Sequence, residues 1–364
     1  MDTSYTKNIK EEALKLIKQI DNSENPNLQI LRRSLNNVFF DNDKKIIKLG
    51  DKKETRNYFN INQAKKFMQT LKILAQINEN LEKKTPNIST RQLFYMTRGI
   101  IENSNEECFE DQSESDPIIE DVEVILDTLR EELGLIATPD GYFVGDIKVK
   151  DLVSGDLLDY TKMGSGGGAI PAIVEKDVYD IIECKAKFVV VLEKFAVWNI
   201  LNQTKFWKKH NCIILTGKGQ AGRSARRLLT RLSNEMKLPV YVLTDLDPWG
   251  YYIYSVYKQG SISLAYFSEK SSVPTAKYIG MTTKDIIKYK IPKSSWMKLK
   301  DIDYKRIKEI KKYDWFQTKE WQRELTRLEE FKYKVESDAF VTKSVDFVVN
   351  EYLPDKIRRQ DFLP

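Results

Sequence analysis

Histidine is almost absent from this chain of 364 residues, in which His210 is the only one. A Ser-His-Asp triad would depend on that single residue, and a zinc site built from several histidines is excluded. We therefore expect any catalytic chemistry to use carboxylates, Lys, Arg, Tyr, Ser or Cys, together with a metal ion that prefers oxygen ligands.

Cysteine is also scarce, since only Cys108, Cys184 and Cys212 occur and they are far apart in the sequence. This odd, widely spaced set argues against a disulfide framework and a cysteine-rich zinc site, and it fits a reducing compartment. Apolar runs such as 188–192 are too short to cross a bilayer, and residues 1–8 lead into a charged amphipathic segment rather than a signal peptide. The sequence thus predicts a cytoplasmic protein with no membrane partner.

The composition is otherwise that of a folded protein, with 41% apolar and 31% charged residues but only 16 Gly and 11 Pro. A chain of this length usually exceeds what one hydrophobic core supports, so we expect two domains plus an extension. The net charge of +6, from 59 basic and 53 acidic residues, is weak evidence for a polyanionic partner.

The first 50 residues contain a helical pattern and a hairpin pattern. Short apolar runs at 38–40 and 46–49, separated by Asp41-Asn42-Asp43, predict two strands joined in a hairpin. Before them, apolar residues recur at helical spacing and predict an amphipathic helix with a face to bury: Ile9, Ala13, Leu16, Ile17 and Ile20.

Three more helices are predicted before residue 130. One carries an apolar stripe over residues 64–81 behind Asn62 as its cap, the next spans 91–101 behind Ser89 or Thr90, and the third includes residues 122–129. A hairpin over 134–144 should follow, because Pro139-Asp140-Gly141 is a turn signal. This order is typical of a winged helix, although a helical domain that merely ends in a hairpin has the same pattern.

Downstream, short apolar runs alternate with helical patterns. The runs 188–192, 212–215 and 240–243 are each followed by such a pattern, which indicates an open, largely parallel α/β sheet. The glycine-rich stretch 164–168 lacks the Gly-Lys-Ser/Thr that completes a P-loop, so we expect a flexible connector there.

Carboxylates follow two of these predicted strands. Glu193 comes directly after 188–192, and Asp245 and Asp247 come after 240–243. Ligands of parallel sheets bind beyond the carboxyl ends of the strands, and residues i and i+2 of an extended segment point the same way. The acidic residues therefore suit Mg²⁺, which binds one or two carboxylates together with water and phosphate. Lys218, which follows the strand at 212–215, is expected near the same edge.

Two interpretations of this cluster stay open from the residues alone. Acidic residues at strand ends commonly cap helices or face solvent, and a run of charge is usually a solvated surface. The adjoining stretch 205–231, however, contains eight Lys or Arg and no acidic residue. A basic segment beside a metal site favours a nucleic-acid phosphate over a small neutral substrate.

Several motifs resemble the family of DNA topoisomerase VI A-subunits. Glu193-Lys, Thr216-Gly-Lys-Gly-Gln220 and Thr244-Asp-Leu-Asp-Pro-Trp-Gly250 are similar to its Toprim domain, and Arg91-Gln-Leu-Phe-Tyr-Met96 resembles its catalytic tyrosine motif. Further similarity at 49–52, 66–71, 257–261 and 352–356 extends the resemblance over nearly the whole chain. The meiotic double-strand-break transesterase shares the core motifs, but the ungapped N-terminal matches favour the topoisomerase.

The resemblance implies roles for individual residues. Tyr95 corresponds to the nucleophile and Arg91 to the arginine near it. Phe94 stands where many relatives have another Tyr, which leaves Tyr95 as the candidate. The expected magnesium ligands are Glu193, Asp245 and Asp247.

Two basic residues, Lys218 and Arg226, are expected to contact DNA. The family pattern supports these two roles less strongly than the others, because Ala221-Gly222 replaces a Pro-Asp pair that is common in the family at this point.

The implied fold is a multidomain combination of α/β and α+β, with a CAP-like winged-helix domain followed by a Toprim α/β domain whose sheet is mainly parallel. We expect an N-terminal extension (1–61) that docks a partner, a winged-helix domain (62–150), and a Toprim domain with C-terminal helices (151–364). The expected docking surface is the following hairpin together with the apolar face of the first helix, formed by Ile9, Leu16, Ile17 and Ile20.

The implied function is that of the DNA-cleavage subunit of an ATP-dependent type IIB topoisomerase. It would act with Mg²⁺ as a homodimer on double-stranded DNA, in association with the nucleoid. ATP would be bound by a separate B subunit within a heterotetramer, because this chain has no P-loop. The alternatives are a transesterase that breaks DNA without resealing it, a non-enzymatic winged-helix DNA-binding protein, and a Toprim nuclease that uses water.

Overall fold

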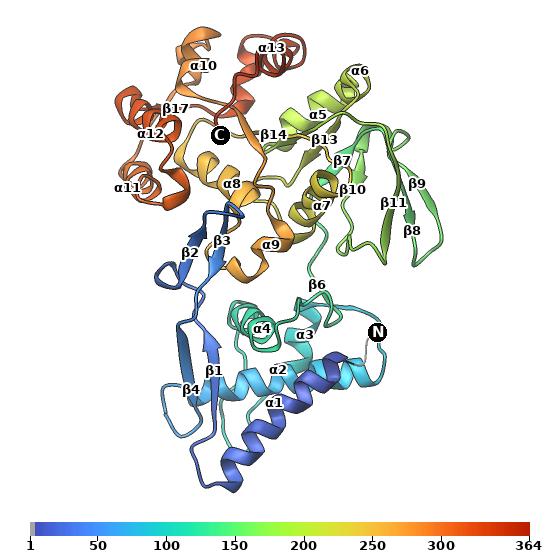
Figure 1. Ribbon diagram of the computed structural model, residues 1–364, viewed down its shortest axis with the longest axis vertical. Coiled ribbons are helices and arrows are strands. Elements are labelled where there is room, and N and C mark those ends of the chain that lie inside the picture. Colours follow the sequence, from blue (N-terminus) through green and yellow to red (C-terminus); the bar gives the residue numbers. More distant parts are fainter. Residues whose placement is uncertain (1–3) are drawn as a thin grey trace. The chain divides into compact units, whose positions relative to one another are not determined.

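The computed structural model describes residues 4–364, and the chain divides into two compact units (Figure 1). The N-terminal unit contains residues up to 39 and residues 49–138, and the C-terminal unit contains residues 40–48 and 139–364. No helix within the described residues is both long and apolar enough to span a membrane.

The N-terminal unit is mainly helical. Its elements are α1 (Ser4–Asp21), β1 (Asn27–Leu31), β4 (Lys53–Asn57), α2 (Ala64–Glu82), β5 (Ile88–Ser89), α3 (Thr90–Thr97), α4 (Gln112–Leu126) and β6 (Leu135–Ile136). Strands β1 and β4 pair antiparallel, and β5 and β6 pair parallel. The core gathers apolar side chains from all four helices, including Ile9, Ile77, Leu93, Phe94 and Val122. The predicted helices are confirmed, and the unit is consistent with a winged-helix region.

Three details of these helices differ from the predictions, and one is that α4 ends at Leu126 instead of continuing to 129. Helix α3 begins behind Ser89 as expected, with a capping box to Gln92, but it ends at Thr97 rather than at 101. Asn62 does not cap α2; the capping position is Gln63, whose side-chain oxygen instead accepts a hydrogen bond from the Asn57 N–H at 2.8 Å.

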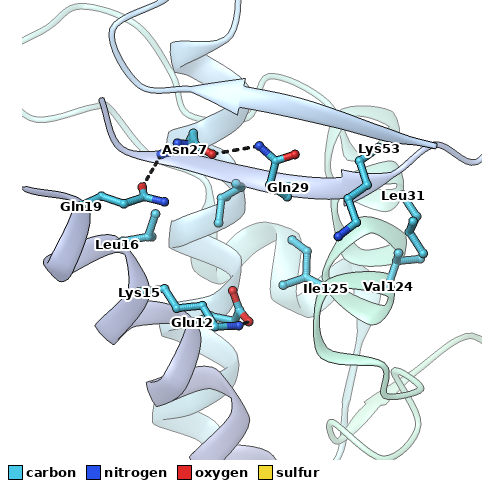
Figure 2. A pocket seen from close by; sticks show the side chains of 11 residues that line it. Glu12, Lys15, Leu16, Gln19, Asn27, Gln29, Leu31, Lys53, Val124 and Ile125 are labelled. Atoms are coloured by element: carbon cyan, nitrogen blue, oxygen red, sulfur yellow. Dashed lines mark hydrogen bonds and ion pairs between the residues drawn. The ribbon is translucent and has the colours of Figure 1, made fainter. Parts of the chain in front are cut away.

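Helix α1 buries only part of its apolar face. Ile9 and Leu16 are buried in the unit's own core, whereas Ile17 and Ile20 are 50% and 59% exposed. Beside the buried part, side chains from α1, β1 and α4 line a pocket of about 380 Å³ (Figure 2). Gln19 lies at one end of this pocket, where its side-chain oxygen accepts a hydrogen bond from the Asn27 N–H at the start of β1, at 2.8 Å.

The prediction of a hairpin over residues 134–144 is wrong. Residues 135–136 pair with β5 in the N-terminal unit, whereas β7 (Tyr142–Val144) joins the sheet of the C-terminal unit and pairs antiparallel with β13 (Ile213–Thr216). Phe143 and Val144 are completely or almost completely buried there. The Pro139-Asp140-Gly141 segment therefore opens the C-terminal unit and leads into β7.

The C-terminal unit is built around a six-stranded sheet with the order β10-β7-β13-β12-β14-β15. Strands β12 (Val189–Leu192), β13 and β14 (Val240–Leu243) are parallel, as predicted, and the unpredicted β15 (Lys277–Gly280) is parallel to them. Strands β7 and β10 (Gly168–Ala169) form an antiparallel edge. A second sheet contains β8 (Ile147–Asp151), β9 (Leu157–Asp159) and β11 (Tyr179–Cys184).

The helices of this unit lie mostly between or after the parallel strands. They are α5 (Phe195–Gln203), α6 (Phe206–His210), α7 (Arg223–Asn234), α8 (Pro248–Gln259), α9 (Ser268–Ser271), α10 (Thr283–Lys288), α11 (Asp301–Ile310), α12 (Lys319–Phe331) and α13 (Leu353–Arg359). A two-stranded pair, β16 (Met297–Lys298) with β17 (Tyr333–Lys334), lies among the last four. Figure 1 shows these C-terminal helices in orange and red.

The predicted hairpin near the N-terminus is present as β2 (Val38–Asp41) and β3 (Ile46–Leu49). Residues 40–48 of this hairpin belong to the C-terminal unit. Lys44 and Lys48 pair with Glu269 at 2.8 and 2.9 Å, and the Phe40 ring lies 6.5 Å from that of Trp315. These contacts pack the hairpin against the C-terminal unit of the same chain.

The end of the glycine-rich stretch 164–168 is packed against aromatic rings, whereas Gly164 and Gly166 have open space around them, so the flexible connector stays a prediction for residues 164–166. A Cβ at Gly167 would lie 2.4 Å from the Trp198 ring, and one at Gly168 would lie 2.2 Å from the Tyr160 ring. The Asn202 side chain also donates to the Ser165 carbonyl at 2.8 Å. Glycine is needed here because the rings approach the backbone too closely for any side chain.

A buried carboxylate organises the N-terminal unit. Asp121 on α4 accepts hydrogen bonds from Arg33, which follows β1, at 2.8 and 3.1 Å. Its other oxygen pairs with Arg56 on β4, which also donates to Thr70 at 3.2 Å. One acidic side chain therefore bridges two largely buried guanidinium groups, which also pair with Glu120 and Glu54, and joins the strands to α4.

Asp121→Ala is expected to destabilise the N-terminal unit by about 3–5 kcal/mol, because it leaves two buried cations without their shared partner. Amide hydrogen exchange of α4 and β4 measures this loss directly. Tryptophan emission does not, since all six tryptophans lie between residues 198 and 321. Asp116→Ala, which removes an exposed carboxylate from the same helix, should change the exchange by no more than about 0.5 kcal/mol. Equal exchange in the two variants would contradict the assignment.

Candidate functional site

Helix α3 presents Tyr95 at the surface of the N-terminal unit. Leu93 and Phe94 are buried in the core, whereas Tyr95 is 56% exposed. Arg91 lies one turn earlier on the same face, with its Nη2 atom 3.5 Å from the Tyr95 hydroxyl and its guanidinium carbon 5.8 Å from the ring centroid. The structure thus brings together the two residues predicted from the tyrosine motif, and places a cation next to the phenol oxygen.

The carboxylates are brought together by the parallel sheet of the C-terminal unit. Strands β12 and β14 are direct neighbours in register, so Glu193 and Asp245 emerge side by side. The Asp245 N–H donates to the Glu193 carboxylate at 3.0 Å. Asp247 caps α8 and accepts a hydrogen bond from the Gly250 N–H at 2.6 Å. A Cβ at Gly250 would lie 2.4 Å from the Asp245 carbonyl oxygen, so this tight turn requires glycine.

Asp245 is almost fully buried and has three donors. Ser337 donates its backbone N–H and its hydroxyl to Oδ1 at 2.8 and 2.7 Å, and Lys194 Nζ lies 3.2 Å from Oδ2. The same ammonium group is 3.7 Å from Glu336. Lys194 therefore holds a central position among carboxylates.

The segment around Ser337 was not predicted from the sequence. Val335 pairs with Leu246 through two backbone hydrogen bonds of 2.9 and 3.1 Å, which brings the segment alongside the Asp245 turn. No motif marks these residues. The one signal in the sequence is the alternation of Val335 with polar neighbours between two helical patterns.

Burial disfavours the ionised form of the carboxyl groups at this edge of the sheet. Burial, reinforced by the nearby Asp245 carboxylate, raises the pKa of Glu193 from 4.5 to about 8. Burial also raises the pKa of Asp247 from 3.8 to about 6, with a smaller contribution from Asp245. Burial opposes the charged form of Lys194, yet the carboxylates of Asp245 and Glu336 raise its pKa overall, so it stays protonated.

These carboxylates fit an oxygen-liganded divalent cation in their chemistry. Within residues 4–364, no three His, Cys, Asp or Glu side chains converge closely enough to hold a metal ion, because Asp245 turns to Lys194 and Ser337 while Asp247 caps α8. Even so, Glu193 and Asp247 are partly buried acids, and a cation would stabilise the ionised form that their raised pKa values disfavour. Glu193, Asp245 and Asp247 are the residues that could hold Mg²⁺.

Lys218 lies near the same edge of the sheet. It follows β13 with a positive φ of 56°, and its exposed ammonium lies 4.6 Å from the centre of the Tyr142 ring. The loop is tied to the site, because the N–H of Gly219 donates to the Glu193 carbonyl at 2.8 Å.

The expected role of Arg226 in DNA contact requires correction. Its side chain is 2% exposed and its guanidinium lies against the Phe267 ring at 5.7 Å, so it does not face a ligand at the surface. The other arginines of α7 are also engaged within the chain: Arg227 pairs with Glu175 at 2.6 Å, and Arg231 donates to two backbone carbonyls. The exposed cations of the stretch 205–231 are Lys205, Lys208, Lys209 and Lys218.

Both units of the chain contain a segment that matches a known family model. Residues 65–135, which include Tyr95, match the model of type IIB DNA topoisomerases, and residues 188–357 match the model of the Toprim domain shared by topoisomerase 6 A-subunits and Spo11. The chain is 43% identical to the A-subunit of the type 2 DNA topoisomerase 6 of Pyrococcus abyssi, with 98% of this chain and 95% of the relative covered. The proteins of the same description from Hyperthermus butylicus (97% and 94% covered) and Methanocaldococcus jannaschii (95% and 92% covered) are each 38% identical.

The raised pKa of Glu193 predicts a fall in stability with rising pH. Between about pH 4.5 and 8 the folded chain keeps a proton that the unfolded chain has released, so the free energy of unfolding must decrease as the pH rises. In metal-free buffer we expect Glu193→Gln to remove on the order of 2 kcal/mol of this decrease. Urea unfolding followed by tryptophan emission at a series of pH values measures the difference from wild type.

The comparison cancels other titrating groups, such as His210, whose pKa is lowered by burial in both proteins. Glu351→Gln is the matched control, because Glu351 is exposed. An identical pH dependence of stability in wild type and Glu193→Gln would contradict the prediction, because it would show that folding does not raise the pKa of Glu193.

Proposed function

Because the chain belongs to the family of type 2 DNA topoisomerase 6 A-subunits, we propose that it is the subunit that cleaves and reseals DNA, with Tyr95 as nucleophile. The observation that carries this proposal is the difference in exposure between two adjacent aromatic residues. Phe94 is buried in the core, whereas Tyr95 is exposed beside Arg91. The carboxylate cluster at the sheet edge supports a metal-assisted reaction on a phosphate.

The reaction is a transesterification. The Tyr95 oxygen attacks a backbone phosphorus and loses its proton, the bond from phosphorus to the 3′-oxygen breaks, and that oxygen takes up a proton to become a 3′-hydroxyl. The 5′-phosphate is then joined to Tyr95. A free tyrosine has a pKa of about 10, so a neighbouring cation is needed to favour the phenolate, and Arg91 is placed for that task.

A divalent cation, when bound, supplies positive charge to the phosphate that is attacked. Glu193, Asp245 and Asp247 would hold it. The number of phosphoester bonds is unchanged by cleavage, so the 3′-hydroxyl can attack the phosphotyrosine and restore the strand without an external energy source.

Cleavage of both strands requires two copies of the chain. Each Tyr95 breaks one strand, and a homodimer with twofold symmetry matches the symmetry of the duplex. Tyr95 and the carboxylate cluster belong to different units of the chain. The family resemblance supports an arrangement in which each Tyr95 acts with the cluster of the other copy.

ATP-dependent passage of a second duplex would need a partner. The sequence has no P-loop, so an ATPase B subunit would supply nucleotide binding within a heterotetramer. The resemblance supports a contact in the N-terminal region, where Ile17 and Ile20 are exposed on α1.

Tyr95→Phe should lower the yield of covalent protein–DNA adduct at least about a thousandfold, because it removes the nucleophilic oxygen and leaves the ring in place. DNA affinity and dimerisation should stay at wild-type levels. The adduct is measured by denaturing the complex with detergent and quantifying DNA bound to protein. Tyr58→Phe, at another exposed tyrosine of the same unit, is the control and should keep full activity.

The outcomes separate this proposal from the alternatives. Free 5′-phosphates without attached protein would identify a nuclease, and DNA binding without cleavage in the wild-type complex would identify a non-enzymatic binding protein. An adduct that forms but never reseals would identify a break-forming transesterase.

The arrangement in trans predicts complementation between two inactive variants. In a heterodimer of Tyr95→Phe with Glu193→Gln, one composite site carries both changes and the other carries neither, so single-strand nicks should appear at about half the wild-type number of cuts per dimer. Nicking of supercoiled plasmid by the mixed chains measures this. Sites built within one chain would each retain one defect, and mixing would then give no more nicking than the separate variants.

A further inference from the structure

Lys194 neutralises Asp245 at the position where a metal ligand is expected. Its ammonium lies 3.2 Å from Oδ2 of Asp245 and 3.7 Å from Glu336. The two donors from Ser337 already occupy Oδ1 of Asp245. Oδ2 is therefore the oxygen that remains for a cation, and Lys194 is bound to it.

A divalent cation and the Lys194 ammonium cannot both approach Oδ2 closely. Like charges repel strongly at a buried site, where the effective dielectric constant is well below that of water. Asp245 itself cannot turn away from Lys194 easily, because it is almost fully buried and its other oxygen is held by Ser337. Lys194 is the more mobile partner, since its side chain is 30% exposed and has a flexible four-carbon stem.

We propose that Lys194 is a positioning residue that competes with the divalent cation for Asp245 and so keeps metal binding weak until DNA is present. When a cation occupies the cluster, the ammonium leaves Oδ2 and becomes available to a DNA phosphate, an exchange of one ion pair for another. The inference rests on the proposed function, because it assumes that Glu193, Asp245 and Asp247 hold the metal ion.

A purely structural ion pair makes the opposite prediction. If Lys194 only stabilised the fold, its loss would let the Asp245 turn rearrange and separate the carboxylates, which would weaken both metal binding and cleavage. Competition instead predicts that loss of the positive charge strengthens metal binding while it impairs cleavage. The sign of the change in metal affinity distinguishes the two roles.

The test is Mn²⁺ binding to the full-length chain without DNA, followed by electron paramagnetic resonance of free Mn²⁺. Lys194→Gln, which keeps a hydrogen-bond donor but no charge, should bind Mn²⁺ about tenfold more tightly than wild type. Lys194→Met should do the same, so that the result does not depend on one variant folding. Lys194→Arg should restore the wild-type affinity, and Lys187→Met, which removes an exposed lysine elsewhere in the unit, should not change it.

Cleavage of DNA by Lys194→Gln in the complex with the ATPase partner should fall at least about tenfold despite the tighter metal binding. An unchanged or weaker Mn²⁺ affinity in both neutral variants would overturn the inference while leaving the metal site in place. The separate control is Glu193→Gln with Asp247→Asn: if these changes leave wild-type Mn²⁺ binding intact, the cluster does not hold the metal, and the proposed metal role fails together with the inference.

Discussion

The parallel pairing of β12 with β14 is the constraint on which the site depends. These strands lie in register at the centre of the sheet, and each leads at the same edge into a segment with an acidic residue. Hydrogen bonding between neighbouring strands therefore places Glu193 beside Asp245, although two negatively charged carboxylates repel each other. The fold creates the concentration of negative charge, and the surrounding residues adapt to it.

That adaptation is visible in three features of the C-terminal unit. Ser337 and Lys194 neutralise Asp245, the α8 N-terminus takes up Asp247, and Glu193 is left with a pKa raised to about 8 by burial and by its neighbour. A site that only had to be stable would not need three acidic residues at one sheet edge. Buried charge of this kind is typical of sites that bind a cation or a charged substrate.

Much of the architecture could be predicted from the sequence because its signals are local. Each parallel strand is a short run of apolar residues followed by a helical pattern, and the carboxylates stand directly behind those runs. Residues 142–144 were misassigned because the Pro-Asp-Gly turn is also local, whereas their pairing with β13 joins residues about 70 positions apart. Ser337 was missed for the same reason, since the alternation around Val335 does not reveal that Val335 pairs with Leu246, which is distant in the sequence.

The arginines of α7 illustrate a different limit. Arg223, Arg226, Arg227 and Arg231 have the spacing of a basic helical surface, but Phe267, Glu175 and backbone carbonyls cover them in the fold. The sequence shows which side chains are charged, but it does not show which residues pack against them in the fold. Tyr95 shows the reverse case, because its role comes from the family resemblance, and only the structure separates its exposed ring from the buried Phe94.

The most direct test of the account is to identify the residue that becomes attached to DNA. Trypsin should release residues 92–98 as one peptide, since Arg91 and Arg98 flank a segment that contains Tyr95 as its only tyrosine. After cleavage is trapped and the DNA digested with nuclease, mass spectrometry should find a 5′-nucleotide on Tyr95 in this peptide. A nucleotide on any other residue, or cut DNA without a modified peptide, would contradict the central claim.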